Sequence, residues 1–323
     1  MKDFARTVVS GGKRFLLRVE ISHEPADYEK YECLRNEIWD FPDDHLSGTR
    51  NMMCENYFHE GGSLFLGAFV EDGRGAFPAD FEHLAGFSYG FVGVRDKTLG
   101  FREPSNLRFY SQFTGVRDAF QSYGLGIRLK EFQKEMLLEI FGIACVICTY
   151  DPLTAVNAYR NVHHFGMDVV EYRRATYGAY GGRLNRTDIP TDRFLMSWDL
   201  ARTPPRPKAP PGALPDSGPE VLKIEKRIVQ GRSGVLELET AAAVDLSVDA
   251  PLFRVRIPCD FYRMLRETDT DDLVVRRIPL EWRLMTREAF TNLFARGFRV
   301  ADFIRPSRPE GGFYLLEKSA DAE

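Results

Sequence analysis

The chain has 323 residues, which is more than one hydrophobic core usually serves, so its length predicts two domains. Its residues are 44% hydrophobic and 28% charged, a composition that excludes disorder as the default state. The formal net charge of −4 argues against a nucleic-acid partner, which needs a clustered excess of Lys and Arg. No apolar run reaches the roughly 18 residues that span a bilayer, and the first residues lack the apolar core of a signal peptide. We therefore expect a cytoplasmic protein without a membrane partner.

The five cysteines favour free thiols over a disulfide framework. Cys145 and Cys148 form the one suggestive pair, and they lie in an apolar, β-branched run. Residues three apart point to opposite faces of a strand, so the two thiols are poorly placed to share a metal ion. We expect no metal site.

The first half of the chain predicts a helix among several strands. A strand is expected over residues 14–21, and apolar residues at three- and four-residue steps then predict an amphipathic helix from Ala26 to Phe41. A shorter helical piece is expected over 52–58. Apolar, β-branched and aromatic stretches bounded by Gly and Asp predict the next strands, at residues 63–72, 83–96 and 107–116.

A glycine turn then leads into a second helix, predicted from Leu125 to Phe141. A buried strand over 143–150 follows and is ended by Asp151-Pro152. Another helix is expected from Leu153 to Phe165, with Gly166 well placed to terminate it. Two strands, at 167–174 and 192–200, close the segment. The order of elements predicts a mixed α/β domain and not a helical bundle.

Residues 202–219, RTPPRPKAPPGALPDSGP, hold seven of the eighteen prolines. Such a stretch favours an extended spacer, so it predicts the boundary between an N-terminal domain (1–201) and a C-terminal domain (220–323). The C-terminal domain is strand-rich at first and then helical.

Two segments of the chain resemble each other. AYRNVHHFGMDVVEY (158–172) aligned with AFTNLFARGFRVADF (289–303) matches Ala, Asn, Gly and Val identically. Each is a helix, a glycine and a strand, and another strand follows each. This unit also recurs by chance, but we favour a degenerate internal half-repeat. The second copy has no equivalent of the glycine turn.

The stretch QSYGLG (121–126) is the one that most directly suggests chemistry. A strand that passes through a glycine-rich turn into a helix leaves the first helical N–H groups unpaired, and the helix dipole adds about half a positive charge there. Without side chains at Gly124 and Gly126, bare main chain can approach a phosphate. The glycine spacing excludes the dinucleotide and P-loop motifs. A helix cap without any ligand is the structural alternative.

Gln121-x-x-Gly124-x-Gly126 resembles the Q/R-x-x-G-x-G/A pyrophosphate loop of the GNAT superfamily of N-acetyltransferases. The preceding strand, the helix, the buried strand and the two closing strands fall in the order of that family. TYDPLTAVNAYRN (149–161), IPTDRFLMSW (189–198) and EWRLMTREAFTNLFARGFRVADF (281–303) resemble a predicted-acetyltransferase branch that has an extra C-terminal region.

This resemblance covers roughly residues 15–200 and the C-terminal stretch. It implies an α/β (α+β) fold with a GNAT-like mixed, mostly antiparallel sheet flanked by helices. A smaller C-terminal α/β domain that lacks the pyrophosphate loop would follow.

The resemblance also implies acetyl-CoA (coenzyme A) as the cofactor. Main-chain groups at the end of the strand would meet the pantetheine arm, loop N–H groups would hold the pyrophosphate, and two asparagines one helical turn apart would add amide contacts. The implied residues are Phe113, Thr114, Gly115, Val116, Gln121, Ser122, Tyr123, Gly124, Leu125, Gly126, Ile127, Asn157 and Asn161. For the strand residues plain core packing is the alternative, and for the asparagines capping or solvent exposure.

The resemblance implies direct attack of an amine on the thioester, without a covalent enzyme intermediate. The family's acid is commonly a Tyr four residues before the glycine that ends the second helix, where this chain has Val162. Tyr159 is the nearest tyrosine and is the candidate acid, with a core position as the alternative. The strand before the loop often supplies the base; here it has no carboxylate, and Tyr110 and Ser111 are candidates for a water relay.

These features predict an acyltransferase that moves an acetyl group from acetyl-CoA to the amine of a small molecule. The alternative is a non-catalytic acyl-CoA binding or sensing protein. A third interpretation makes the C-terminal half a subunit-interaction element of a homodimer, with the proline spacer allowing exchange between protomers.

Overall fold

The computed structural model describes residues 4–22, 24–39, 62–179, 181–202, 218–305 and 311–318. By its internal contacts the chain divides into two compact units, Met1–Cys148 with Asp199–Ala201, and Thr149–Trp198 with Arg202–Glu323. The domain boundaries expected from the sequence stay a prediction. The greater part of the expected linker, 203–217, and the short helix expected over 52–58 lie outside the described residues.

The first unit is built on a mixed sheet whose strands follow one another in chain order. They are β1 (Ala5–Ser10), β2 (Lys13–Val19), β3 (Ser63–Val70), β4 (Leu84–Val94), β5 (Leu107–Val116) and β6 (Cys145–Tyr150). Neighbouring strands pair antiparallel except β5 and β6, which are parallel. β6 continues along the chain into the second unit. The expected mostly antiparallel, mixed α/β architecture is confirmed.

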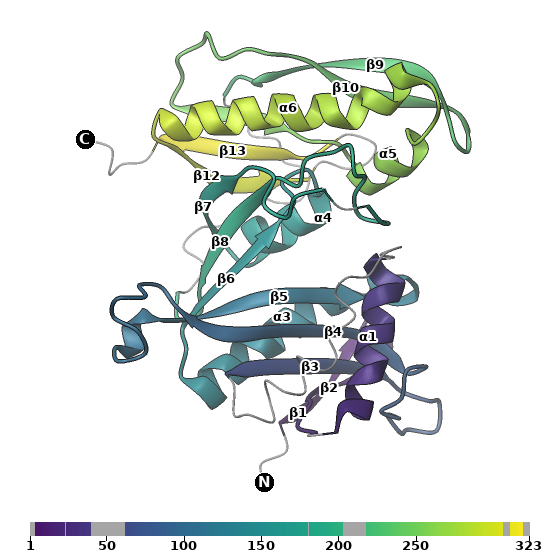
Figure 1. The fold of residues 1–323 in the computed structure, drawn as a ribbon, viewed down its shortest axis with the longest axis vertical. Helices are drawn as coiled ribbons and strands as arrows, with labels where there is room; N and C mark the ends of the chain where they lie inside the picture. The colour runs from purple at the N-terminus through teal and green to yellow at the C-terminus, as the bar shows by residue number, and fades with distance from the viewer. Residues whose placement is uncertain are drawn as a thin grey trace. The chain divides into compact units, whose positions relative to one another are not determined.

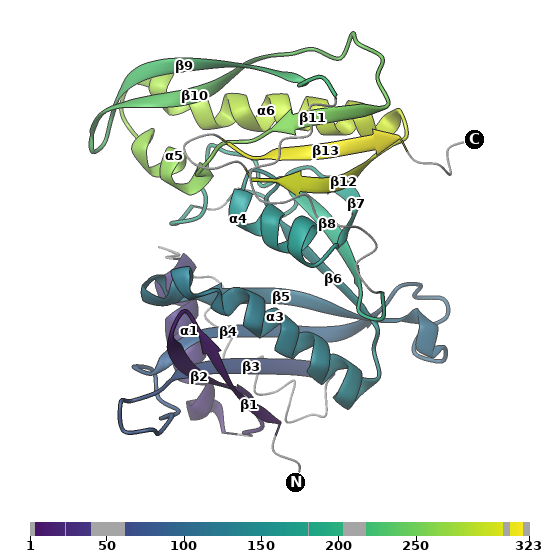
Figure 2. The same cartoon turned by 180° about the vertical axis from the view of Figure 1, so that it is seen from behind.

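Two helices, α1 (Pro25–Trp39) and α3 (Leu125–Met136), cover opposite faces of this sheet (Figures 1 and 2). α1 buries tyrosine, leucine and isoleucine side chains at three- and four-residue steps against aromatic residues of β3 and β4. α3 buries Leu125, Leu129, Phe132 and Met136 and continues into a π-helical turn, η3 (Leu137–Phe141), so the predicted span of 125–141 is confirmed. Among the described helices, none combines the length and apolar character that crossing a bilayer requires.

The β1–β2 hairpin is absent from the sequence-based prediction, which begins at residue 14. Its turn is Gly11-Gly12, and both residues have positive φ angles, 56° and 80°. Two-residue hairpin turns favour such angles because their twist matches that of the flanking strands. The Gly-Gly pair between two β-branched and apolar runs was the available signal.

The second unit begins with the end of β6 and a short helix, α4 (Ala155–Ala158), which continues into a π-helical turn, η4 (Tyr159–His164). β7 (Asp168–Arg173) then pairs antiparallel with β8 (Arg193–Asp199). The chain resumes with a long hairpin of β9 (Leu222–Gly231) and β10 (Gly234–Val244).

The last part of the second unit contains β11 (Leu252–Arg256), α5 (Phe261–Glu267), α6 (Leu273–Ala295), β12 (Phe298–Ile304) and β13 (Phe313–Lys318). The strands form a three-stranded antiparallel sheet in the order β11-β13-β12. α6 contacts both the β9–β10 hairpin and this sheet, and both views show it between them (Figures 1 and 2).

The internal resemblance seen in the sequence has a structural counterpart in strand register. Each copy ends its helix at a glycine of positive φ, Gly166 at 62° and Gly297 at 83°. The strand that follows is bulged at the same aligned position, because the pairing skips Val170 in β7 and Ala301 in β12. The equivalent strand pairs are Val169–Met196 with Val300–Leu316, and Tyr172–Phe194 with Phe303–Tyr314. A bulge is a specific feature, so a shared one supports the half-repeat.

The edge of β11 is covered by the last two residues of the proline-rich stretch and the two that follow it. Arg254 donates its N–H to the carbonyl of Pro219 at 2.9 Å and accepts the N–H of Val221 at 2.9 Å, and Glu220 forms a parallel bridge with Arg254. Arg254 Nε also donates to the carbonyl of Gly218 at 3.0 Å. The short segment 218–221 therefore lies parallel to β11, as β5 lies parallel to β6 in the first unit.

Two buried carboxylates in the second unit bind arginines of α6. Asp151 pairs with Arg283 and Asp192 with Arg287. The stretches 149–161, 189–198 and 281–303, which carry the resemblance to one acetyltransferase branch, thus meet in one cluster of ion pairs. The second pair is strong: Arg287 donates from Nε and Nη2 to the two Asp192 oxygens at 2.8 Å, and the Tyr172 hydroxyl donates at 2.6 Å.

Asp192 is 0% exposed. Burial alone would raise its pKa, but the hydrogen bonds from Arg287, Tyr172 and the Ala175 N–H outweigh that effect and the pKa is lowered. A carboxyl group with a lowered folded-state pKa contributes stability that is present above its unfolded-state pKa and is lost as the pH falls through the folded-state value.

We expect Asp192→Asn to lower the free energy of unfolding at neutral pH by about 3 kcal/mol, because it weakens a buried ion pair. The difference from wild type should shrink as the pH falls below about 4, where Asp192 becomes protonated first in the unfolded chain and then, at lower pH, in the folded protein. Urea unfolding followed by circular dichroism from acidic to neutral pH measures both effects. Asp271→Asn, at an exposed position, is the control. A difference that stays constant with pH would contradict the assignment.

Candidate functional site

The glycine turn adopts the geometry that the sequence predicts. β5 ends at Val116, a 3₁₀ turn, η2 (Asp118–Tyr123), follows, and α3 starts directly after Gly124. Gly124 has φ 71° and ψ 11°, in the left-handed region that favours glycine. It occupies the N-cap of α3 and makes no side-chain cap hydrogen bond. No side chain caps the first turn of α3, and the Gly124 carbonyl accepts the N–H groups of Ile127 at 3.0 Å and of Arg128 at 3.4 Å.

Beside this turn, β5 departs from regular pairing. Gly90 pairs with Ser111 and Tyr89 with Phe113, so Gln112 is an extra residue that bulges from the strand. The Oε1 atom of Gln112 is buried and has no hydrogen-bond partner in the described part of the chain. The parallel pairing of β5 with β6 ends at Tyr110, so on this side of β5 the following main chain has groups available for another partner.

The side chains at the end of β5 serve packing and local hydrogen bonds. Phe113 lies 5.6 Å from Trp39 of α1, ring centroid to ring centroid. A Cβ atom on Gly115 would come within 2.8 to 3.0 Å of Ile38 and Trp39, so glycine allows α1 to lie close there. The Thr114 hydroxyl is 3.1 Å from that of Ser88. Main-chain groups are therefore what the end of β5 can offer a ligand.

The β1–β2 hairpin holds the glycine turn in place. Ser10 donates a hydrogen bond to the Tyr123 carbonyl, and a Cβ atom on Gly11 would collide with the Tyr123 ring at 2.3 Å. Lys13 places Nζ at 5.3 Å from the ring centroids of both Phe120 and Tyr123. The positive charge of Lys13 thus lies beside the turn. The sequence-based prediction did not include Lys13 because it did not include the β1–β2 hairpin.

Gln121 uses its amide within the turn, since Nε2 donates to Asp118 Oδ1 at 2.7 Å and to the Val116 carbonyl at 3.4 Å. Arg117 lies beside the turn but donates to the carbonyls of Phe81 and Glu82. Arg128 pairs with Glu131 at 2.9 Å. These side chains are therefore engaged by neighbouring protein groups, which leaves main-chain N–H groups as what the turn can offer a ligand.

Tyr110 and Ser111, the two relay candidates, lie on opposite faces of β5. The Tyr110 ring is 5.5 Å from that of Phe91, on the side of α1. Ser111 is 5% exposed and faces α3, where Lys130 Nζ donates to its hydroxyl at 2.6 Å. Lys130 also donates to Gln133 Oε1 at 3.0 Å. The sequence did not predict the buried contact between Lys130 and Ser111, because Lys130 and Gln133 lie among apolar residues on the buried face of α3.

The remaining predicted residues belong to the second unit. Asn157 and Asn161 share a helical face as expected, since Arg160 donates to Asn157 Oδ1 at 2.7 Å and to Asn161 Oδ1 at 3.3 Å. Tyr159 stacks on His163 with ring centroids 4.8 Å apart, and His163 Nδ1 is 3.0 Å from Asp302 Oδ1. Their proposed contacts with the cofactor rest on the resemblance alone.

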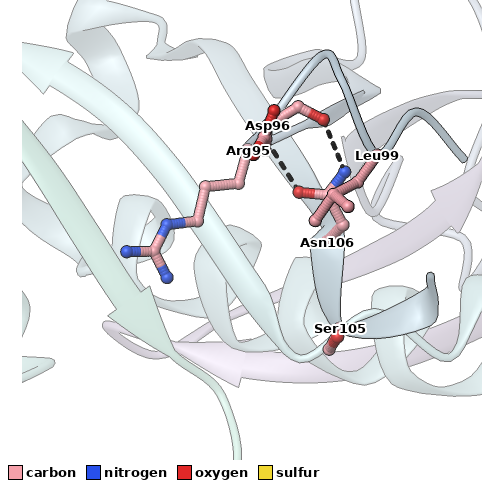
Figure 3. A pocket seen from close by; sticks show the side chains of 5 residues that line it. All are labelled: Arg95, Asp96, Leu99, Ser105 and Asn106. Carbon is pink, nitrogen blue, oxygen red and sulfur yellow. Dashed lines mark hydrogen bonds between the residues drawn. The ribbon is translucent and has the colours of Figure 1, made fainter.

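A hollow of about 340 Å³ in the β4–β5 connection is lined by Arg95, Asp96, Leu99, Ser105 and Asn106 (Figure 3). The Asn106 amide is occupied by the loop itself: Oδ1 accepts the Asp96 N–H at 2.7 Å, and Nδ2 donates to the carbonyls of Asp96 and Gly100. Asn106 therefore shapes the loop. No His, Cys, Asp and Glu cluster suited to a metal occurs among the residues described.

Comparison with protein-family models found no match, and no curated protein matches. Solved structures do match. An acetyltransferase of the GNAT family from Streptococcus pneumoniae is 15% identical, covering 57% of this chain and 97% of its own, with a TM-score of 0.40. NAA60 of Arabidopsis thaliana, in complex with a bisubstrate analogue, is 15% identical over 57% and 98% of the two chains, with a TM-score of 0.41.

The ribosomal-protein-S18-alanine N-acetyltransferase of Escherichia coli is 16% identical over 58% of this chain and 96% of its own, with a TM-score of 0.40. The Streptococcus pneumoniae structure is of the GNAT family, the family that the sequence motif resembles. A large part of the present chain lies outside each match.

Gly124→Ala tests the backbone requirement of the turn. A Cβ atom there would meet only the Ser10 hydroxyl, at an ordinary 3.6 Å, so the expected cost of about 1–2 kcal/mol comes from the left-handed backbone. Thermal and urea unfolding measure it. Gly93→Ala is the matched control, because the φ angle of Gly93 is not positive and no atom lies within 4 Å of the added methyl group. Equal stability of Gly124→Ala and wild type would refute the requirement.

Proposed function

We propose that this protein is a GNAT-type acyltransferase that binds acetyl-CoA and transfers the acetyl group to the amine of a small molecule. One observation carries the proposal: an uncapped helix N-terminus after Gly124 follows directly on a bulged strand whose pairing with β6 has ended. Helix N-termini bind phosphate through main-chain N–H groups and the helix dipole. The buried, unpartnered Oε1 of Gln112 is a second, independent sign that this edge of β5 has a missing partner.

In this proposal the N–H groups from Ser122 to Ile127 hold the pyrophosphate. The main chain from Phe113 to Val116 meets the pantetheine arm in the manner of an added strand. Lys13, over the aromatic rings of the turn, supplies a positive charge close to the diphosphate. Asn157 and Asn161 are assigned to the cofactor by resemblance. A cytoplasmic location and a homodimer remain predictions from the sequence.

The chemical step is direct transfer. The amine lone pair attacks the thioester carbonyl carbon, a C–N bond forms, and the C–S bond breaks with release of CoA as the thiol. An alkyl amine has a pKa of about 10.4, so a proton must leave it before attack, and a proton must reach the departing thiolate. Tyr110, through water, and Tyr159 are the proposed groups; Ser111 is less suited because its hydroxyl is buried beside Lys130.

A specific feature favours the second candidate function, a non-catalytic acyl-CoA binding protein. β5 carries no carboxylate or histidine near its bulge, and the two relay candidates lie on opposite faces of the strand. Cofactor binding by main-chain groups does not require catalytic side chains. The proposal that the protein binds acyl-CoA is therefore independent of the proposal that it catalyses transfer.

Turnover separates these two functions. We expect thiol release from acetyl-CoA in the presence of small-molecule amines and not of peptides with free N-termini, detected with a thiol reagent. Tight CoA binding by titration calorimetry, without thiol release for any amine in a broad panel, would favour the binding protein. Release with the peptides alone would overturn the small-molecule acceptor.

Gly126→Ala tests the phosphate contact itself. Gly126 lies in the first turn of α3 and its φ angle is not positive, so alanine should preserve or raise stability, by up to about 1 kcal/mol. The added methyl group should nevertheless block the approach of a phosphate oxygen and weaken CoA binding at least tenfold, about 1.4 kcal/mol. Calorimetry with CoA and thermal unfolding give the two readouts. Unchanged CoA affinity would remove the pyrophosphate assignment.

A further inference from the structure

The C-terminal helix α6 reaches the start of α4 through a buried ion pair. Arg283 Nη2 donates to Asp151 Oδ2, across 132 positions of sequence. Arg283 is 0% and Asp151 5% exposed. The Nε and Nη1 atoms of Arg283 are buried without hydrogen-bond partners in the described chain, so Asp151 is the group that holds this guanidinium.

The charge states of the pair are well defined. Burial works to lower the pKa of Arg283, but the charge of Asp151 and the hydrogen bond to it outweigh burial, so the pKa is raised. The guanidinium therefore remains charged at any ordinary pH. Arg193 Nη1 adds a weaker contact to Asp151 Oδ2 at 3.4 Å. A buried charge that loses its one strong partner is left uncompensated, so the geometry of Arg283 and Asp151 is tightly coupled.

Asp151 also builds the turn from which α4 begins. Its Oδ1 accepts the Leu153 N–H at 2.9 Å, and its carbonyl accepts from the N–H and hydroxyl of Thr154 at 3.0 and 2.7 Å. Thr154 is the N-cap residue of α4, and its hydroxyl accepts from Asn157 Nδ2 at 3.1 Å. Direct contacts thus run from Arg283 through Asp151 and Thr154 to Asn157.

We propose that Arg283 is a positioning residue for the acyl-CoA site: it acts through Asp151 to fix the α4 turn and the direction of the Asn157 amide. The inference rests on the proposed function, in which Asn157 contacts the cofactor. It gives the C-terminal region a part in cofactor binding although that region has no pyrophosphate loop of its own. α6 supplies the nearer of the two guanidinium groups that pair with the carboxylate that forms the turn, and Arg193 supplies the other at 3.4 Å.

The same helix provides a matched control. Arg287 lies one turn after Arg283 and also binds a buried aspartate, Asp192. The other donors to that carboxylate, the Tyr172 hydroxyl and the Ala175 N–H, lie outside the α4 turn. Substitutions of Arg287 should cost stability as substitutions of Arg283 do. They should leave the Asn157 amide in place.

The experiment uses the full chain as wild type, Arg283→Lys, Arg283→Met, Arg287→Lys and Arg287→Met. Calorimetric titration with CoA and thermal unfolding are measured on each. We expect all four variants to unfold at lower temperature, and only the Arg283 variants to bind CoA more weakly, about tenfold for Met and less for Lys. A folded Arg283→Met with CoA affinity within about twofold of wild type would overturn the inference. An equal loss of affinity in Arg287→Met would also overturn it.

A double-mutant cycle measures whether the effect of Asn157→Ala on CoA affinity depends on Arg283. A purely structural role of Arg283 predicts no such dependence. Asn157→Ala should weaken CoA binding about fivefold in the wild-type background, the order expected for one hydrogen bond. In the Arg283→Lys background, which keeps the charge and is the variant best able to fold, the same change should have a smaller effect. Full additivity contradicts the proposal. Wild type that gives no heat with CoA would instead refute the proposed function, so the two failures are distinguishable.

Discussion

A buried carboxylate, Asp151, is the constraint on which much of the second unit depends. An unpaired charge in a protein interior is costly, so Asp151 can occupy its place only while hydrogen-bond donors surround it. Those donors come from the α4 turn, from the start of β8 and from the middle of α6. One side chain thus requires three separated stretches of sequence to be present and correctly folded. The C-terminal region is consequently part of the same folded body as α4 and β7–β8.

The sequence predicts the elements that rest on local patterns. The helix over 125–141 and the strands over 63–72, 83–96 and 107–116 follow from periodicity and composition. The glycine turn at Gly124 is also predictable, because it depends on local backbone geometry and not on a distant partner. The aligned repeat was visible as well. The structure adds a further match between the two copies, the shared bulges of β7 and β12, which the aligned residue types do not reveal.

What the sequence did not predict depends on pairing between distant residues. The bulge at Gln112 exists only relative to β4, because an extra residue is defined by its partner strand. The contact of Lys130 with Ser111 joins a helix to a strand, and that of Arg283 with Asp151 joins residues 132 positions apart. The β1–β2 hairpin is a different case, since Gly11-Gly12 was a readable turn signal.

In the first unit, the groups proposed to bind the cofactor are main-chain N–H groups, whereas catalysis would need side chains. In the proposed function the turn would bind through N–H groups that any sequence with the right glycines presents, whereas the side chains near the bulge are neutral or engaged by neighbours. Recognition of this kind tolerates wide sequence change.

The segment 218–221 affects where a fragment of the C-terminal region can begin. By pairing with Arg254 it closes the one side of β11 that β13 leaves open. A recombinant fragment that starts after Val221 would bare a row of main-chain donors and acceptors, which is the usual template for edge-to-edge association between copies. Such a fragment would be prone to aggregate, whereas one that keeps the four residues would stay protected.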